Sequence, residues 1–285
     1  MSTVVGPDGT TQTESLRFFG VFELLRTMNL PRTRVLPVYS GYFAALYDAL
    51  SQEYVWDFPL VRELTSDGPK DILELGCGSG RIALPLARAG HRVVGVDRST
   101  DMLTLFRRKL SAEDQRVADR VELLQQDMRA VTAGRTFDLV LLPANNVSLL
   151  ASAADRLAVF TKAREHLAPH GRFVFDNALL EPERLLRQNQ DLSVVPASTA
   201  SAQQFVISAH RYFPDERAQV MNFYAESVAP DGMTERHLGS WTKAVLDEEQ
   251  VLDLVGAAGM RVVDCRVCEV DHDHRRMKLY VCAPA

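Results

Sequence analysis

Residues 72–80 read Ile-Leu-Glu-Leu-Gly-Cys-Gly-Ser-Gly, a short apolar run that ends in glycines at every second position. Glycines at this density let the backbone turn sharply, and they allow a ligand to approach it without an intervening Cβ. Residues 82–87 follow with apolar side chains at helical spacing, and Gly90 stands where such a helix ends. A strand, a glycine loop and a helix in this order predict an α/β protein that holds a nucleotide-like cofactor at the carboxyl end of the strand.

A second apolar strand follows and ends at Asp97, seventeen residues after Gly80. An acid at this place suits hydrogen bonds to ribose hydroxyls, which both a dinucleotide and S-adenosylmethionine carry. The dinucleotide fingerprint that begins at Gly76 requires a third glycine where Arg81 stands. A shifted register over residues 78–83 fits G-x-G-x-x-A, although its turn begins two residues beyond the apolar run. A nucleotide (NAD(P))-dependent oxidoreductase is therefore the alternative to weigh.

The composition limits the classes of protein and of partner. The chain has 285 residues, 46% of them hydrophobic, which suits a globular domain with a sizeable core. A net charge of −5 without long runs of like charge argues against a nucleic-acid partner. The sequence shows neither an apolar run of about 18 residues nor a basic and then apolar leader, which indicates a cytoplasmic protein without a membrane partner.

Strands and helices alternate along the middle of the chain. We expect strands at 71–75, 92–97, 121–125, 137–143 and 171–176, with helices between them. This alternation predicts a Rossmann-like, doubly wound and mostly parallel sheet. Two closing strands at 261–269 and 276–283 follow a helix that opens with Asp247-x-x-Gln250, a capping-box pattern.

Residues 178–245 have a different pattern. Alternating apolar and polar residues at 204–212, 218–227 and 237–245, separated by turn sequences, predict an inserted antiparallel meander. Ahead of the sheet, residues 15–29 carry apolar side chains at helical spacing, which predicts an amphipathic helix. We expect four parts: a tail and a lid or dimer helix at 1–38, a cofactor-binding core at 39–177, an acceptor-binding cap at 178–245 and the rest of the core sheet at 246–285.

Four stretches, in this order, resemble the class I S-adenosylmethionine-dependent methyltransferases. They are Glu74–Gly80 with Asp97 at the end of the next strand, Asp97–Met102, Gln125–Met128 and Phe137–Pro143. The resemblance runs from about Tyr39 to the C-terminus. It implies a seven-stranded sheet with the last strand antiparallel, with S-adenosyl-L-methionine as cofactor and S-adenosyl-L-homocysteine as product. The core with its insertion looks like the branch that alkylates amino sugars, amines and other secondary metabolites, and the insertion would roof the active site.

The resemblance also implies roles for single residues. Glu74 would orient the methionine end of the cofactor, Asp97 would bind the ribose, and Asp127 would accept a hydrogen bond from the adenine amino group. Asp127 also suits the N-cap of the following segment. The full cofactor-binding set is Tyr42, Glu74, Gly76, Gly78, Gly80, Asp97, Arg98, Met102, Asp127, Met128, Leu142 and Pro143.

The sequence says less about the residues that would contact the methyl acceptor. Asn145 and Asn146 follow the fourth strand, where amide groups can hold a ligand or form a turn. Five residues of the meander are candidates to face an acceptor pocket, with ordinary packing as the alternative: His210, Tyr212, Tyr224, Glu226 and Trp241. Alternation puts His210 and Tyr212 on one face of their strand, and Tyr224 and Glu226 on one face of theirs. We expect substrate contacts from Asn145, Asn146, Tyr224 and Trp241, and catalytic contributions from His210 and Tyr47.

Two metal-like patterns are set aside. Cys265-x-x-Cys268 has the spacing of a zinc or redox pair, but residues three apart in a strand point to opposite faces. Residues 271–274, Asp-His-Asp-His, are better spaced but fall in an expected hairpin turn. We therefore expect no metal.

The sequence thus predicts methyl transfer from S-adenosylmethionine to a nucleophilic nitrogen, oxygen or activated carbon of a small molecule, by in-line displacement. The alternatives are the oxidoreductase and a cofactor-binding protein without catalysis. The amphipathic helix at the N-terminal end also suggests a homodimer.

Overall fold

The computed structural model describes residues 4–5, 11–12, 16–51, 55–189, 191–199, 202–270 and 275–285. The chain divides into two compact units, each described by itself below. The larger unit contains residues 51–180 and 245–285, and the smaller contains residues 1–50 and 181–244. Residues 39–50 therefore belong with the meander, whereas the sequence analysis grouped them with the cofactor-binding core.

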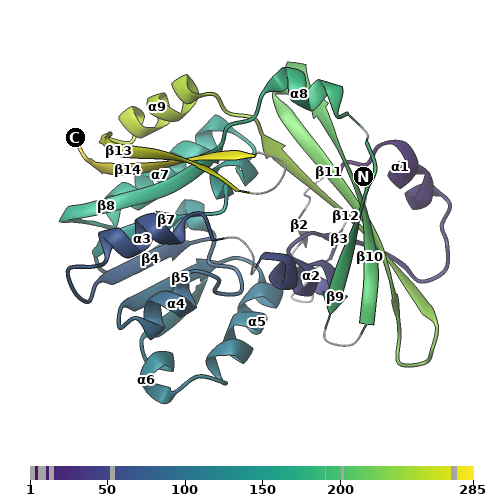
Figure 1. Ribbon diagram of the computed structural model, residues 1–285, viewed down its shortest axis with the longest axis horizontal. Coiled ribbons are helices and arrows are strands. Elements are labelled where there is room, and N and C mark those ends of the chain that lie inside the picture. Colours follow the sequence, from purple (N-terminus) through teal and green to yellow (C-terminus); the bar gives the residue numbers. More distant parts are fainter. Residues whose placement is uncertain are drawn as a thin grey trace. The chain divides into compact units, whose positions relative to one another are not determined.

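The larger unit is built on a seven-stranded sheet in the order β13-β14-β8-β7-β4-β5-β6 (Figure 1). Its strands are β4 (Asp71–Leu75), β5 (Arg92–Asp97), β6 (Val121–Gln125), β7 (Phe137–Leu142), β8 (Leu167–Ala178), β13 (Met260–Glu269) and β14 (Arg276–Pro284). β14 runs antiparallel to both of its neighbours, whereas β4 to β8 pair in parallel. The predicted Rossmann-like sheet with its last strand antiparallel is confirmed.

Helices pack along this sheet. They are α3 (Phe58–Leu64), α4 (Ala83–Arg88), α5 (Thr100–Leu110), α6 (Gln115–Ala118), α7 (Ala153–Glu165) and α9 (Glu248–Ala257), with 3-10 turns η1 (Met128–Ala130) and η2 (Asn146–Leu149). α4 and α5 contact β5, α7 contacts β8, and α9 contacts β13. Side-chain caps start several of them: Ser99 caps α5, and Asp247 forms the predicted capping box with Gln250.

The order of the strands places the site. From β4 the chain proceeds to β5 and β6 on one side, and it then returns to β7 and β8 on the other side of β4. The strand order therefore reverses at β4, and the glycine loop that follows Leu75 begins at this reversal. In open α/β sheets ligands bind outside the carboxyl ends of the strands at such a switch point.

The smaller unit contains a five-stranded sheet in the order β3-β12-β11-β10-β9. The strands are β3 (Thr33–Pro37), β9 (Ser193–Thr199), β10 (Ala202–Phe213), β11 (Ala218–Val228) and β12 (Thr234–Ala244), joined by helices α1 (Gly20–Thr27), α2 (Gly41–Ser51) and α8 (Pro182–Arg187). Two further short strands, β1 (Val4–Val5) and β2 (Thr11–Gln12), pair with each other. The expected antiparallel sheet is therefore present, and the η3 turn (Pro214–Glu216) connects β10 to β11.

Each face of this second sheet has its own core. On one face Phe22 of α1 packs with Val220 and Leu238. On the other face Phe43 and Leu46 of α2 pack with residues of β10 and β11. The first 50 residues of the chain thus contribute side chains to both cores of the smaller unit.

Four elements differ from what the sequence predicts. The helix expected over residues 15–29 is confined to α1, and the following segment forms β3, which pairs in parallel with β12 about 200 residues away. β9 was not expected at all. β8 begins at Leu167, whereas we expected this strand to begin at residue 171, so Gly171 lies inside the strand. Gly171 fits there because a Cβ at this position would lie 2.8 Å from the carbonyl oxygen of Phe137.

Among the residues that the structure describes, no helix has both the length and the apolar character required to cross a membrane.

Candidate functional site

The glycine loop after β4 has a backbone that only glycine adopts readily. Gly76, Gly78 and Gly80 all have positive φ, at 72°, 54° and 85°. The backbone N–H groups of Gly76 and Cys77 both donate to the carbonyl oxygen of Val96, at 2.8 and 3.0 Å. The loop is thereby fixed to the end of β5.

Neighbouring side chains pack directly against these glycines. A Cβ on Gly76 would lie 2.6 Å from Nδ2 of Asn146, and a Cβ on Gly78 would lie 3.0 Å from Cε of Met102. A Cβ on Gly80 would collide with the ring of Phe106, which is fully buried. The three positions therefore cannot carry side chains without rearrangement of the site.

Asp97, at the end of β5, holds the loop from the other side. The N–H of Gly78 donates to Oδ2 of Asp97 at 2.9 Å, and the N–H of Ser99 donates to Oδ1 at 2.8 Å. Burial raises the pKa of Asp97, while these backbone N–H groups oppose the rise. A carboxylate accepts about four hydrogen bonds, so Asp97 keeps acceptor capacity for a ribose hydroxyl.

Glu74 is the most unusual group of the site. Its side chain is 2% exposed, and Oε2 has no hydrogen-bond partner among the described residues. Burial raises the pKa of Glu74 to about 8, partly opposed by the positive charge of Arg81 and by a hydrogen bond from the Ala83 backbone. A buried carboxylate oxygen without a partner is costly unless a ligand satisfies it, and an ammonium group would do so.

A buried ion pair lies beside Glu74, and the sequence analysis missed it. The guanidinium of Arg81 donates to both oxygens of Asp57, at 2.8 and 2.6 Å, and both side chains are buried. The same guanidinium lies 5.5 Å from the ring centroid of Trp56, and the indole Nε1 of Trp56 donates to Oδ2 of Asp176 at 2.9 Å. The one signal in the sequence was the arginine that stands where a dinucleotide fingerprint requires glycine.

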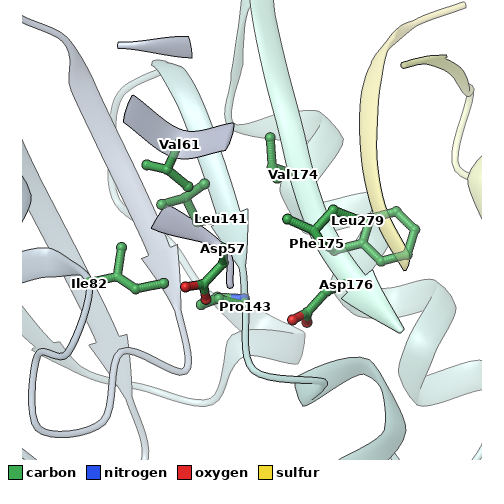
Figure 2. Close-up of a pocket in the computed structure, with 9 residues that line it drawn as sticks. All are labelled: Asp57, Val61, Ile82, Leu141, Pro143, Val174, Phe175, Asp176 and Leu279. Atoms are coloured by element: carbon green, nitrogen blue, oxygen red, sulfur yellow. The ribbon is translucent and has the colours of Figure 1, made fainter. Parts of the chain in front are cut away.

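These acids border a small cavity (Figure 2). Its walls are mainly apolar, and they are formed by Asp57, Val61, Ile82, Leu141, Pro143, Val174, Phe175, Asp176 and Leu279. Figure 2 shows the carboxylates of Asp57 and Asp176 directed toward the same space, with Pro143 beside them. Burial and the nearby charge of Asp57 raise the pKa of Asp176 to about 6. The cavity thus contains two acids in apolar surroundings at the carboxyl ends of the strands.

The two asparagines after β7 have different surroundings. The N–H of Asn145 donates to Oδ1 of Asp176 at 2.6 Å, and its own Oδ1 accepts from the N–H of Ala178 at 3.3 Å. Asn145, with a φ of 56°, therefore joins the end of β7 to the end of β8. Asn146 instead donates from Nδ2 to the carbonyl oxygen of Gly76 at 3.4 Å, which places it on the glycine loop. Leu142, just before this turn, is completely buried.

The acid expected at the adenine end, Asp127, caps the η1 turn. It accepts a hydrogen bond from the backbone N–H of Arg129 at 2.9 Å and forms an ion pair with the guanidinium of the same residue. This interaction with Arg129 lowers the pKa of Asp127. Met128 opens the turn, and Arg98 is exposed at the end of β5.

The smaller unit contains the remaining candidates. The ring of Tyr42 stacks on His237 with centroids 4.1 Å apart, and Tyr47 makes an edge contact with Tyr39. Three buried ring nitrogens lack a hydrogen-bond partner among the described residues: Nε2 of His210, Nδ1 of His237 and Nε1 of Trp241. Burial lowers the pKa of His210, which favours a neutral imidazole.

The strand register separates these candidates. His210 pairs with Met221, and Met221 pairs with Trp241, so His210 and Trp241 share one face of the sheet. Tyr224 lies three residues along β11 from Met221 and faces the opposite side, where its hydroxyl donates to Glu226 at 2.5 Å. Tyr224 and Trp241, both of which we expected to contact the acceptor, therefore lie on opposite faces of the sheet.

Within the part of the chain that the structure describes, no cluster of three or more metal-binding side chains occurs. Cys265 and Cys268 are free thiols on β13. Residues 271–274 lie outside the described residues.

The reversal of strand order, the glycine loop and the two carboxylates agree with the resemblance to the class I S-adenosylmethionine-dependent methyltransferases. Residues 72–171 match the family described as "Methyltransferase domain". The match assigns the glycine loop to this class rather than to the dinucleotide-binding alternative.

Known relatives agree with this class. The chain is 32% identical over 142 residues to the cypemycin N-terminal methyltransferase of a Streptomyces species. The aligned region covers 49% of this chain and 56% of that protein. The matches span about half the length of the curated relatives. The fold resembles that of DesVI from Streptomyces venezuelae (TM-score 0.67, 22% identity, 87% of this chain and 100% of the other). It also resembles CcbJ from Streptomyces caelestis (TM-score 0.66, 20% identity, 87% and 98%).

Proposed function

We propose that this protein transfers the methyl group of S-adenosylmethionine to a nucleophilic nitrogen, oxygen or activated carbon of a small molecule. The observation that carries the proposal is the buried carboxyl of Glu74, which has an oxygen without a partner among the described residues and is followed by a loop whose glycines have no side chains of their own. A ligand that brings an ammonium group and a ribose fits Glu74 and Asp97 together.

The residues of the larger unit would bind and orient the cofactor, which when bound supplies a methyl group already activated on a sulfonium. Glu74 would accept from the ammonium, Asp97 from the ribose hydroxyls and Asp127 from the adenine amino group. Met102, which lies against Gly78, would contact the adenine. Alignment of two bound reactants is worth about 7–11 kcal/mol of barrier, so this binding accounts for much of the catalysis.

The acceptor class rests on relatives. Cypemycin N-terminal methyltransferase and the glycopeptide N-methyltransferase MtfA (TM-score 0.60, 20% identity) are named for amine-bearing natural products. A secondary metabolite of this kind is the acceptor that we propose here. The face of the second sheet with His210 and Trp241 has the buried nitrogens that a polar acceptor would satisfy.

On this face His210 is our candidate base. Because burial lowers its pKa, the imidazole is neutral near pH 7 and can accept a proton from a hydroxyl or an ammonium acceptor. Tyr47 and Asn146 remain proposed contacts of the acceptor, and Tyr42 remains a proposed contact of the cofactor.

Association of two copies through α1 is also proposed. Val21, Leu24 and Met28 of this segment are 42%, 58% and 53% exposed, whereas Phe22 is buried in the unit's own core. A monomer mass by light scattering, unchanged by Leu24→Glu, would contradict this association.

Calorimetry and turnover test the proposed function together. We expect S-adenosylhomocysteine to bind with one site per chain and NADH not to bind. Mass spectrometry with S-adenosylmethionine and a panel of amine, hydroxyl and carbon acceptors should then detect a product heavier by one methylene unit. Binding of S-adenosylhomocysteine without turnover on any acceptor would favour the cofactor-binding protein without catalysis.

A further inference from the structure

Arg129 lies between two acids that belong to different parts of the larger unit. Its Nε and Nη2 donate to the carboxylate of Asp127, at 3.0 and 2.5 Å. Its Nη1 donates to Oδ1 of Asp155 at 2.7 Å, and Asp155 is in the first turn of α7. One guanidinium therefore joins the turn after β6 to the start of a helix that follows β7.

Both ends of this bridge are themselves held in place. The N–H of Arg129 donates to Oδ1 of Asp127, so backbone and side chain of the same residue grip one carboxylate. At the other end Ser152 Oγ donates to Oδ2 of Asp155 at 2.7 Å and caps α7. Several N–H donors of Arg129 thus fix the side-chain rotamer of Asp127, and Asp155 in turn holds the guanidinium of Arg129.

We propose that Arg129 is a positioning residue for adenine recognition: it holds the Asp127 carboxylate, and the η1 turn that begins with Met128, in the orientation that accepts the adenine amino group. The proposal rests on the proposed function, because it assumes that Asp127 faces the adenine of a bound cofactor. Arg129 itself is not assigned any contact with the ligand.

The charges and the hydrogen-bond capacity agree with this role. The three N–H donors of Arg129 occupy about three of the four acceptor sites of the Asp127 carboxylate, with Nε shared between Oδ1 at 3.0 Å and Oδ2 at 3.1 Å, so that about one site remains for the adenine amino group. Without Arg129 the side chain of Asp127, which is 34% exposed, would sample other rotamers and bind water. The recognition of the amino group would then lose its preorganised acceptor.

Calorimetry with two ligands tests the proposal. The first ligand is S-adenosylhomocysteine, and the second is its analogue in which hydrogen replaces the adenine amino group. The wild-type protein should prefer the first by about tenfold, which is the range for one hydrogen bond to a charged group. In Arg129→Gln this preference should fall to about twofold, while the affinity for the analogue changes little. Asp155→Asn, which removes only the far end of the bridge, should give an intermediate preference.

A matched control is Lys162→Gln, which removes one positive charge from an exposed ion pair with Glu165 on α7. It should keep the full tenfold preference. An unchanged preference in Arg129→Gln, with S-adenosylhomocysteine still bound, overturns the positioning role. Equal loss of affinity for both ligands also overturns it, because a merely structural role would weaken both alike. Failure of the wild type to bind S-adenosylhomocysteine at all would instead overturn the proposed function.

Discussion

The two carboxylates at the glycine loop, Glu74 and Asp97, are held in different ways, and only Glu74 is fully buried. Asp97 is fixed by two backbone N–H groups, whereas one oxygen of Glu74 has no partner. Asp97 therefore serves the fold of the loop as well as the ligand, and its removal would affect both. Glu74 is the better probe of ligand binding alone.

The raised pKa of Glu74, about 8, predicts that ligand binding is linked to proton release. Below pH 8 the carboxyl is mostly protonated in the ligand-free protein, but it must ionise to bind an ammonium group. The affinity for S-adenosylhomocysteine should therefore weaken by up to about tenfold per pH unit as the pH falls from 8 to 6.5. Calorimetry at pH 7 in buffers of different ionisation enthalpy should detect close to one released proton.

The raised pKa of Glu74 also affects the stability of the ligand-free protein. Because the folded pKa of Glu74 is raised, the folded state holds a proton that the unfolded state releases between about pH 4.5 and 8. This contribution to stability is fully present below the unfolded pKa and is lost as the pH rises through 8. Glu74→Gln should abolish both the proton release and this part of the pH dependence. Proton release that persists in Glu74→Gln would assign it to another group.

The buried pair of Arg81 and Asp57 should contribute strongly to stability when only one partner is removed. Arg81→Leu leaves the Asp57 carboxylate buried without its two hydrogen bonds, which costs about 3–5 kcal/mol. Arg88→Leu removes an exposed pair with Glu113 and should destabilise the protein far less, because solvent screens that pair. Urea unfolding measures both.

Adding Asp57→Asn to Arg81→Leu should recover part of the stability, because the uncompensated charge is then gone. Equal effects of Arg81→Leu and Arg88→Leu would show that burial of the Arg81 pair has no energetic consequence. The pair could not be predicted from the sequence, since Asp57 precedes Arg81 by twenty-four residues and each alone resembles an ordinary surface charge.

At the scale of elements, the cofactor half of the site was predictable because its signals are local. A glycine run directly after an apolar strand, with an acid at the end of the next strand, specifies both backbone and chemistry over about 25 residues. The second sheet was predictable only as alternating strands. β3 could not be foreseen, because its pairing with β12 joins segments about 200 residues apart. The opposite faces of Tyr224 and Trp241 could not be foreseen either, since only the register between strands relates the face of one strand to that of the next.

An added methyl group should destabilise the protein far more at Gly80, in the glycine loop, than at Gly90, which follows α4. Gly80 and Gly90 both have positive φ, at 85° and 103°, but a Cβ on Gly80 meets the buried ring of Phe106, whereas a Cβ on Gly90 meets open space. Gly90→Ala should cost only the backbone strain, about 1–2 kcal/mol. Gly80→Ala should cost about 1–3 kcal/mol more and weaken S-adenosylhomocysteine binding as well. Equal unfolding free energies for the two variants would contradict the packing at Gly80.

At the scale of the whole molecule, the chain crosses between two units with separate cores. The larger unit is interrupted in sequence by residues 181–244, and the smaller is completed by the first 50 residues. The change of residue pattern over 178–245 predicts this interruption. Residues 1–38 were expected to form a tail and a lid or dimer helix, because the apolar face of a helix does not reveal which core it enters. In the structure Phe22 of α1 is 1% exposed and packs against Val220 of β11.

This arrangement predicts two thermal transitions that respond to different changes. Phe22→Ala removes a buried aromatic ring from the smaller unit, which costs about 3–5 kcal/mol, and should lower the Tm of one transition in scanning calorimetry. S-adenosylhomocysteine should raise the Tm of the other transition, because Glu74, Asp97 and the glycine loop all belong to the larger unit. Val21→Ala, which truncates an exposed side chain of the same helix, should move neither transition by more than about 1 °C. A single transition that Phe22→Ala lowers and the ligand raises would show instead that the two cores unfold together.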